Sequence, residues 1–95
     1  MKKRVWLLLS RLAAQRVDQL LKTKLTYRQR ETIKLRSGVG DGTAYPRPQC
    51  ALIFNMTVAR IGRIEEAAIK KLKKQDPLLW DLIVELGKMR TAGML

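Results

Sequence analysis

Residues 45–72, YPRPQCALIFNMTVARIGRIEEAAIKKL, predict two helices joined by a very short turn. Residues 49–54 have helical composition, Asn55 breaks the run, and the hydroxyl of Thr57 can cap a second helix by accepting a free backbone N–H. The second helix, over 57–72, has apolar residues at spacings of three and four, namely Ile61, Ile64, Ala68 and Leu72. This is the outline of a helix-turn-helix. We expect Cys50, Ala51, Phe54 and Met56 to pack between its helices.

The charge of the chain is its outlying property. Twenty Lys and Arg against eight Asp and Glu give a net charge of +12 over 95 residues. This balance predicts attraction to polyanions, nucleic acid first and an anionic membrane second, although charge also serves solubility. The length predicts one small domain over 1–95. Only five per cent of the residues are aromatic, which leaves little for a base-stacking platform.

Several classes of function are disfavoured by what the sequence lacks. With a single cysteine and no histidine, we expect no internal disulfide, no metal site and no cofactor. The eight carboxylates are scattered, so we predict no catalytic residues and no enzyme. The start, MKKRVWLLLSRLAA, imitates a signal peptide, but Arg11 interrupts its apolar run. We therefore expect a cytoplasmic protein, with no membrane-spanning helix.

Helices are also predicted on both sides of the central stretch. Residues 4–23 form an amphipathic helix that we expect to cover the core, with a partner protein, self-association or a membrane surface as alternatives. A capping box of Thr26 and Gln29 begins a second helix. Asp76 and Pro77 begin a last helix over 77–91. Its predicted apolar face consists of Leu78, Leu79, Leu82, Ile83, Leu86 and Met89. The fold class is all-α, with about five helices.

Glycines follow the second helix. Three of them lie in residues 38–42, a density that suggests a phosphate-cradling loop. No strand precedes them and no Lys-Ser or Lys-Thr follows, so a helix end and a flexible link are favoured. The helix before them repels itself unless phosphate or an acidic partner neutralises its cations, which are Arg28, Arg30, Lys34 and Arg36.

Residues 25–74, LTYRQRETIKLRSGVGDGTAYPRPQCALIFNMTVARIGRIEEAAIKKLKK, resemble region four of bacterial housekeeping-type sigma factors, the domain that recognises the minus thirty-five promoter element. The resemblance covers about half of the chain. It is carried by Leu25-Thr26 with Arg28 and Arg30, Leu35-Arg36, the Gly40-Asp41-Gly42 link, Ile53-Phe54 with Thr57, Arg60-Ile61, Ile64-Glu65, Ala68 and Lys70-Lys71-Leu72. It implies a sigma-like transcription regulator that binds DNA or engages RNA polymerase. Without the promoter-melting region of a sigma factor, we do not expect this chain to initiate transcription alone.

The chain departs from this family at the positions that contact base edges. There the family has a set such as Arg, Glu, Arg and Gln, whereas this chain has Val58, Ala59, Gly62 and Arg63. A bidentate contact from Arg to guanine contributes roughly 1 to 3 kcal/mol of discrimination, so the resemblance implies altered or reduced base specificity. An apolar patch on the same side consists of Leu52, Ile53 and Val58. Such a patch suggests that a protein partner or the chain's own terminal helices cover it.

The sequence therefore leaves three hypotheses. The first is a DNA-binding regulator that holds duplex DNA through a helix-turn-helix and a basic surface. The second is a module that docks on RNA polymerase or a sigma factor through Leu52, Ile53 and Val58, and the third is a basic structural protein bound to RNA. We favour the first, with little base discrimination. Thr57, Val58, Ala59 and Gly62 are then predicted to face the DNA, and phosphates are predicted to meet Arg28, Arg30, Arg36, Arg47, Arg60, Arg63, Lys70 and Lys71.

Overall fold

Helices account for all the regular structure in residues 3–39 and 42–91, which are the residues that the computed structural model describes. The helices are α1 (Lys3–Lys24), α2 (Tyr27–Ser37), α3 (Arg47–Phe54), α4 (Val58–Gln75) and α5 (Pro77–Thr91). The predicted all-α class is thus confirmed for the described part of the chain. Within the same residues, no helix combines the length and the apolarity that a membrane span requires.

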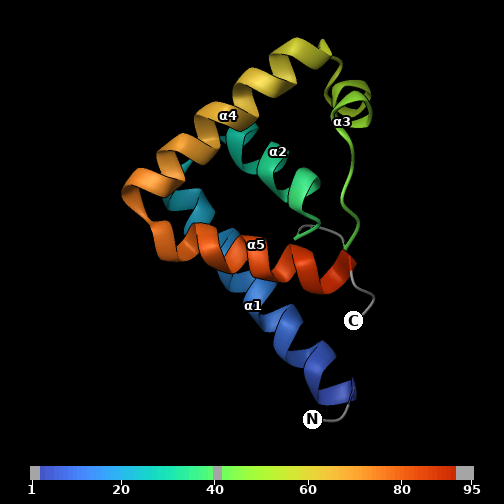
Figure 1. Cartoon of the computed structure of the whole chain (residues 1–95), viewed down its shortest axis with the longest axis vertical. Coiled ribbons are helices and arrows are strands. Elements are labelled where there is room, and N and C mark those ends of the chain that lie inside the picture. The colour runs from blue at the N-terminus through green and yellow to red at the C-terminus, as the bar shows by residue number, and fades with distance from the viewer. Residues whose placement is uncertain (1–2, 40–41, 92–95) are drawn as a thin grey trace.

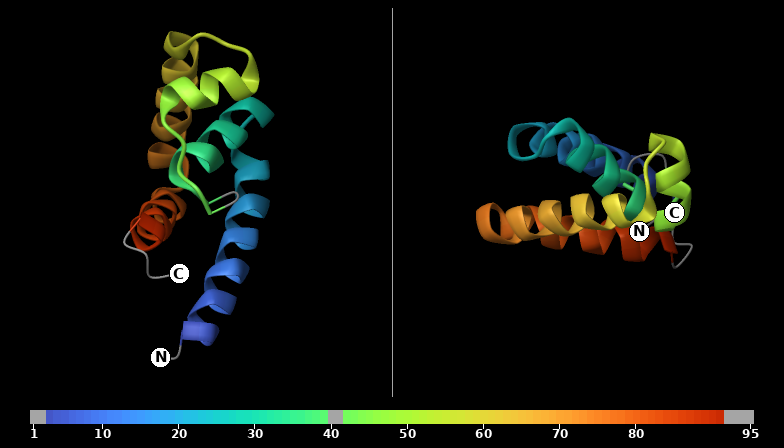
Figure 2. Two further views of the ribbon diagram at one scale, coloured as in Figure 1. Left: turned by 90° about the vertical axis from the view of Figure 1, so that its right-hand side faces the viewer. Right: turned by 90° about the horizontal axis from the view of Figure 1, so that it is seen from above.

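The helices lie in two layers. Seen from above, α1 and α2 form one layer, α4 and α5 form the other, and α3 lies at one end (Figure 2). The long helix α1 extends well beyond the others, and α5 crosses in front of it (Figure 1). The molecule is accordingly elongated, with extents of 42 × 27 × 17 Å.

Local capping signals set the helix ends. The Thr26 hydroxyl accepts from the Gln29 N–H at 3.3 Å, and the Gln29 side chain accepts from the Thr26 N–H at 3.2 Å, which is the predicted capping box. Thr57 accepts from the Arg60 N–H at 3.1 Å, and Asp76 from the Leu79 N–H at 3.2 Å. Each cap satisfies an N–H that has no partner within its own helix.

Chain reversals occur where the backbone adopts positive φ. Gly38 ends α2 at φ 80°, and its N–H donates to the carbonyl of Lys34. Asn55 ends α3 at φ 55°, so the break predicted there is a left-handed cap. The link of 55–57 between α3 and α4 is therefore short. Gly40 and Asp41, which belong to the predicted glycine link, lie outside the described residues.

The apolar residues form two clusters. The larger one joins α1, α2, α4 and α5 and contains Val17, Leu21, Leu25, Ile33, Val39, Ala68, Leu72, Leu79, Ile83 and Leu86. The smaller one lies between α3 and α4 and contains Cys50, Ala51 and Ile61, with Phe54 and Met56 packed against it. The second half of α1 thus covers the core as predicted. Cys50 is fully buried, which also confirms its predicted place in the core.

Some residues predicted to be apolar contacts are exposed instead. On α5, Leu79, Ile83 and Leu86 are buried, whereas Leu78 is 79% exposed and Leu82 is 38% exposed. The predicted face was too wide, because α5 meets its neighbours along one stripe only. Tyr27 of α2 and Leu12 of α1 are exposed too. The side chains of Val5, Leu8, Leu9 and Met89 lie outside the described set.

Candidate nucleic-acid interface

A carboxylate at the centre of the predicted interface holds two of the predicted phosphate-binding arginines. Glu65 of α4 is buried, and its Oε2 accepts from Nε of Arg36 on α2 at 2.9 Å. Its Oε1 accepts from Nε of Arg47 on α3 at 2.7 Å. The Glu65 hydrogen bond is the largest cause of the raised pKa of Arg47. Glu65 therefore ties α2, α3 and α4 together, and both arginines are committed to the fold.

Arg47 also changes the role of one predicted base-reading position. Gly62 is buried, and a Cβ built on it would lie 3.1 Å from Nη1 of Arg47. The guanidinium of Arg47 thus lies over the backbone of α4 at this point. Gly62 was predicted to face DNA, whereas in this structure it is buried beneath the Arg47 side chain. A side chain at position 62 would therefore require the Arg47 guanidinium to shift by a few tenths of an ångström.

Exposed cations form one stripe along α4. Arg60, Arg63, Lys70 and Lys74 are exposed, with Ala67 in the middle, and successive members are three or four residues apart. This spacing places them on one side of a helix, opposite the buried Ile61, Ala68 and Leu72. None of the four makes an ion pair within the described residues. The stripe is about 21 Å long at 1.5 Å per residue. We refer to these four cations as the α4 cationic stripe.

The other predicted phosphate contacts, on α2 and α4, differ in how accessible they are. Arg28 is exposed, as predicted for a phosphate contact. Arg30 is half-buried, lies 5.3 Å from the ring centre of Tyr27 and pairs with Glu31 at 3.4 Å. Lys71 is also half-buried and donates to the Gln29 side chain at 3.5 Å. Arg30 and Lys71 are therefore less available to a ligand than Arg28.

The start of α4 exposes the other predicted DNA-facing residues. Thr57, Val58 and Ala59 are exposed, beside a shallow hollow at the link between α3 and α4. That hollow is lined by Asn55, Met56, Thr57, Arg60 and Arg63. The structure therefore brings two cations of the stripe to the turn, where a groove-binding helix would present its first residues.

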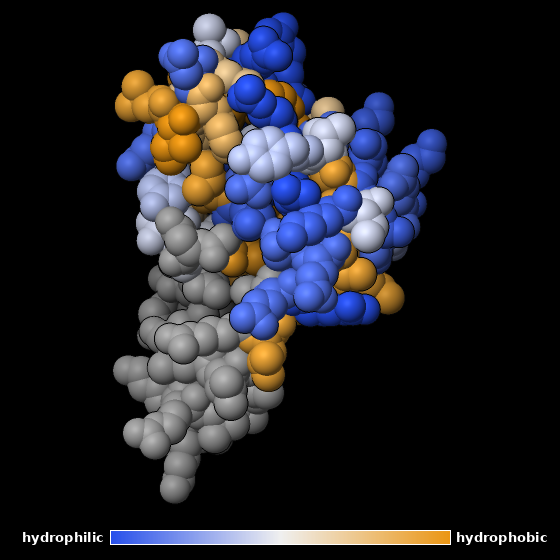
Figure 3. Space-filling view, turned by 180° about the vertical axis from the view of Figure 1, so that it is seen from behind, coloured by the Kyte–Doolittle hydropathy of each residue, from blue (hydrophilic) through white to orange (hydrophobic). Residues whose placement is uncertain are grey.

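An apolar patch adjoins this hollow. Leu52 is 82% exposed, Ile53 is 53% exposed and Val58 is 45% exposed. In a space-filling view, hydrophobic side chains gather over α3 (upper left in Figure 3), while much of the remaining coloured surface is hydrophilic. We call these three residues the α3–α4 patch. Its exposure agrees with the prediction from sequence.

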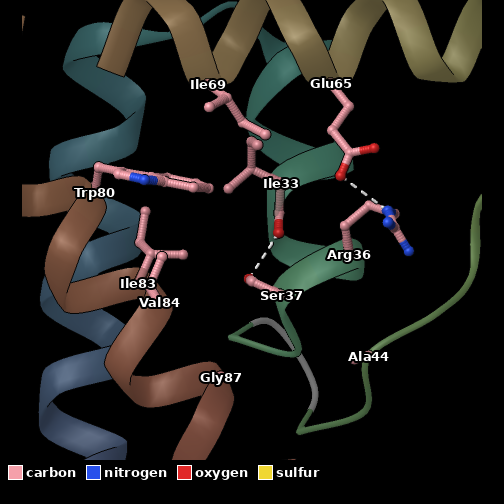
Figure 4. A pocket seen from close by; sticks show the side chains of 10 residues that line it. All are labelled: Ile33, Arg36, Ser37, Ala44, Glu65, Ile69, Trp80, Ile83, Val84 and Gly87. Atoms are coloured by element: carbon pink, nitrogen blue, oxygen red, sulfur yellow. Dashed lines mark hydrogen bonds and ion pairs between the residues drawn. The ribbon is translucent and has the colours of Figure 1, made fainter. Parts of the chain in front are cut away.

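A separate cleft of about 240 Å³ lies between α2, α4 and α5. Figure 4 shows the side chains of Ile33, Ile69 and Trp80 around its space, with the Glu65–Arg36 ion pair at its other side. Its lining is mostly apolar, and the two charged residues in that lining pair with each other. We therefore assign the cleft to the packing of α5.

Two features of the site were missed in the sequence. The double pairing of Glu65 joins residues 29 and 18 positions apart, so no local pattern indicates it. Lys74 belongs to the α4 cationic stripe and lies four residues after Lys70. Extending the predicted helix beyond Leu72 would have identified it. Comparisons of this chain with protein-family models, with curated proteins and with solved structures found no match.

Proposed function

We propose that this chain is a DNA-binding transcription regulator of the sigma region four type, in which α3, the link and α4 act as a helix-turn-helix on duplex DNA. The observation that carries the proposal is the α4 cationic stripe, four exposed cations that make no ion pair within the described residues. A net charge of +12 supplies the long-range attraction. Its place of action is the cytoplasm, where bacterial DNA lies.

The length of the stripe divides its cations between two roles. The major groove is about 12 Å wide, whereas the stripe is about 21 Å long. Arg60 and Arg63 are near the start of α4, so they enter or border the groove. Lys70 and Lys74 then remain outside it and meet phosphates of the flanking backbone. Arg28 of α2 is a further phosphate contact, while Arg36 and Arg47 stabilise the fold through Glu65.

Weak base discrimination follows from the same geometry. Val58 and Ala59 offer only apolar contacts, for example to thymine methyl groups, and Gly62 is covered by Arg47. Among the four positions that contact base edges in the sigma family, Arg63 is therefore the one with a hydrogen-bonding side chain, and it makes no ion pair within the described residues. Phosphate contacts position a protein without specifying sequence. We propose binding with affinity for duplex DNA in general and with modest sequence preference through Arg63.

A salt titration on random-sequence duplexes tests this function. Removing one phosphate-binding side chain should reduce the slope of log affinity against log salt by about 0.9. Lys70→Ala and Lys74→Ala should therefore each lower the slope by about one, on all sequences alike. Arg16→Ala removes an exposed cation of α1 and should leave the slope unchanged. No binding by the wild type at low salt would reject the proposal.

The exposed α3–α4 patch favours a second candidate function. In this alternative the chain docks on RNA polymerase or a sigma factor through Leu52, Ile53 and Val58, and does not bind specific DNA. Docking on an apolar surface depends little on salt, whereas phosphate contacts depend on it steeply. Purified polymerase or sigma factor should then retain the wild-type chain at high salt, and Leu52→Glu should abolish retention.

A further inference from the structure

The solvent side of α5 is a second apolar surface, and its charge is opposite to that of the α3–α4 patch. Leu78 and Leu82 are exposed one turn apart, and Asp81 lies between them in sequence, exposed and without an ion pair within the described residues. Glu85 is exposed one turn further along. We call Leu78, Asp81, Leu82 and Glu85 the α5 face. In a chain with only eight carboxylates, two of them border this apolar pair.

The α3–α4 patch presents the complementary arrangement. Its apolar residues, Leu52, Ile53 and Val58, adjoin Arg60 and Arg63, both exposed. The α3–α4 patch therefore combines an exposed leucine with arginines, and the α5 face combines exposed leucines with acidic side chains. When two such surfaces meet, their apolar residues leave water together and their charged borders attract.

One molecule cannot bring its own two surfaces together. The α3–α4 patch adjoins the start of α4, and the α5 face follows its end (Figure 1). The 18 residues of α4 separate them by about 27 Å at 1.5 Å per residue. Contact between the two surfaces is therefore possible only between different molecules.

We propose that the α5 face of one copy docks on the α3–α4 patch of a second copy, in a head-to-tail contact. Two symmetric pairings are the alternatives. Patch against patch would bring the arginines of both copies together, and α5 against α5 would bring Asp81 of both copies together. Like charges at an interface disfavour such pairings. A head-to-tail contact leaves one free surface of each kind at the ends, so it propagates into open chains or closes into a ring.

The charge of the whole molecule sets the conditions of the contact. Two copies of net charge +12 repel each other at long range. At 0.15 M salt the Debye length is about 8 Å, which screens this repulsion while adjacent charges still interact. We therefore expect association to be weak and concentration-dependent, and to be visible at physiological salt. It requires no nucleic acid, so it is independent of the proposed DNA binding.

Sedimentation equilibrium of the full chain with two single variants tests the proposal. Leu52→Glu disables the patch and keeps the α5 face, whereas Leu78→Lys disables the α5 face and keeps the patch. Both residues are exposed, so both variants should fold, which circular dichroism checks. The wild-type average mass should rise with concentration above the 10.9 kDa of one chain. Each variant alone should remain at the monomer mass.

Mixing the two variants decides the geometry. An equimolar mixture has one working surface of each kind, so it should form a pair of about twice the monomer mass and nothing larger. If Leu78→Lys self-associates alone, the contact is patch to patch, and if Leu52→Glu does so alone, it is α5 to α5. Either result overturns the proposal. A wild type that stays monomeric at every concentration, or a mixture that forms no pair, also overturns it.

Discussion

At the scale of single residues, Glu65 is the residue that joins three helices, α2, α3 and α4. It is a buried carboxylate that accepts from Arg36 and Arg47, and each arginine comes from a different helix. Glu65→Gln keeps the shape but has one carbonyl oxygen in place of two anionic ones. Hydrogen bonds to charged groups contribute about 1.5 to 3 kcal/mol each, so we expect a loss of about 2 kcal/mol of unfolding free energy. Urea unfolding followed by circular dichroism measures it.

The neighbouring carboxylate provides a matched control for this prediction. The side chain of Glu66 is 71% exposed and reaches Arg47 only at 3.8 Å. Glu66→Gln should therefore change the unfolding free energy by less than about 0.5 kcal/mol. Equal effects of the two substitutions would show that the pairing at Glu65 contributes no more than a surface charge.

Asp18 makes the stability of the chain depend on pH. Its Oδ1 lies 2.9 Å from Nζ of Lys34, which joins α1 to α2. The adjacent ammonium of Lys34 lowers the pKa of Asp18, against the opposing effect of burial. A carboxyl whose pKa is lower in the folded state stabilises the fold above its unfolded pKa of about 3.9, and this stabilisation is lost as pH falls through the folded value.

We therefore expect the unfolding free energy of the wild type to decrease as the pH falls below about 5, through the unfolded pKa and then the lower folded pKa of Asp18. Asp18→Asn removes this titration, so its profile should be flatter over the same range. Lys34→Met removes the partner of Asp18 and should flatten the profile as well. Unfolding midpoints measured in urea at each pH give the comparison. An equally steep fall in Asp18→Asn would assign the acid sensitivity to other carboxyls.

At the scale of elements, the helix ends were predictable because the signals that set them are local. Thr26 with Gln29, Thr57, and Asp76 with Pro77 each act within one turn of helix, and each begins a helix where the sequence predicted it. The face that each helix buries was less predictable. On α5, Leu78 and Leu82 have the same helical spacing as their buried neighbours, and only the position of α1 and α4 decides which of them meet the core.

The cap at the start of α4 gives a prediction at this scale. Thr57 satisfies the Arg60 N–H, and α4 carries both the core residue Ile61 and the α4 cationic stripe. Thr57→Ala should therefore reduce the unfolding free energy by about 1 kcal/mol, because an N–H at the helix start loses its acceptor. Thr57→Ser keeps an acceptor oxygen and should restore most of the loss. If serine destabilises as much as alanine, the hydroxyl is not the stabilising group.

At the scale of the whole molecule, the sequence predicts which cations form the candidate interface but not which of them are free. Charge composition indicates attraction to polyanions whatever the fold is. Whether a given arginine is free depends on the carboxylates that folding brings to it, and Glu65 occupies two of the predicted eight cations. Of the predicted cations, those that are exposed and make no ion pair within the described residues are Arg28 on α2 and three on one side of α4, namely Arg60, Arg63 and Lys70.

Two proposals converge on that region, because Arg60 and Arg63 border both the DNA groove contact and the α3–α4 patch. Duplex DNA and a second copy should then compete for the same end of α4. The mixed pair of Leu52→Glu and Leu78→Lys chains, labelled at their N-termini with a donor and an acceptor dye, reports this competition by energy transfer. Adding short duplex DNA at 0.15 M salt should lower the transfer to the level of unpaired chains.

This prediction depends on both proposals, and separate measurements show which one fails. Sedimentation without DNA tests the contact between copies, and the salt titration tests DNA binding. If both succeed and saturating duplex leaves the energy transfer unchanged, then DNA and the second copy occupy different surfaces. In that case Arg60 and Arg63 serve only one of the two contacts. Arg63→Ala in the Leu78→Lys chain would then show which contact uses Arg63. The substitution should weaken either pairing with the second copy or DNA binding, and leave the other unchanged.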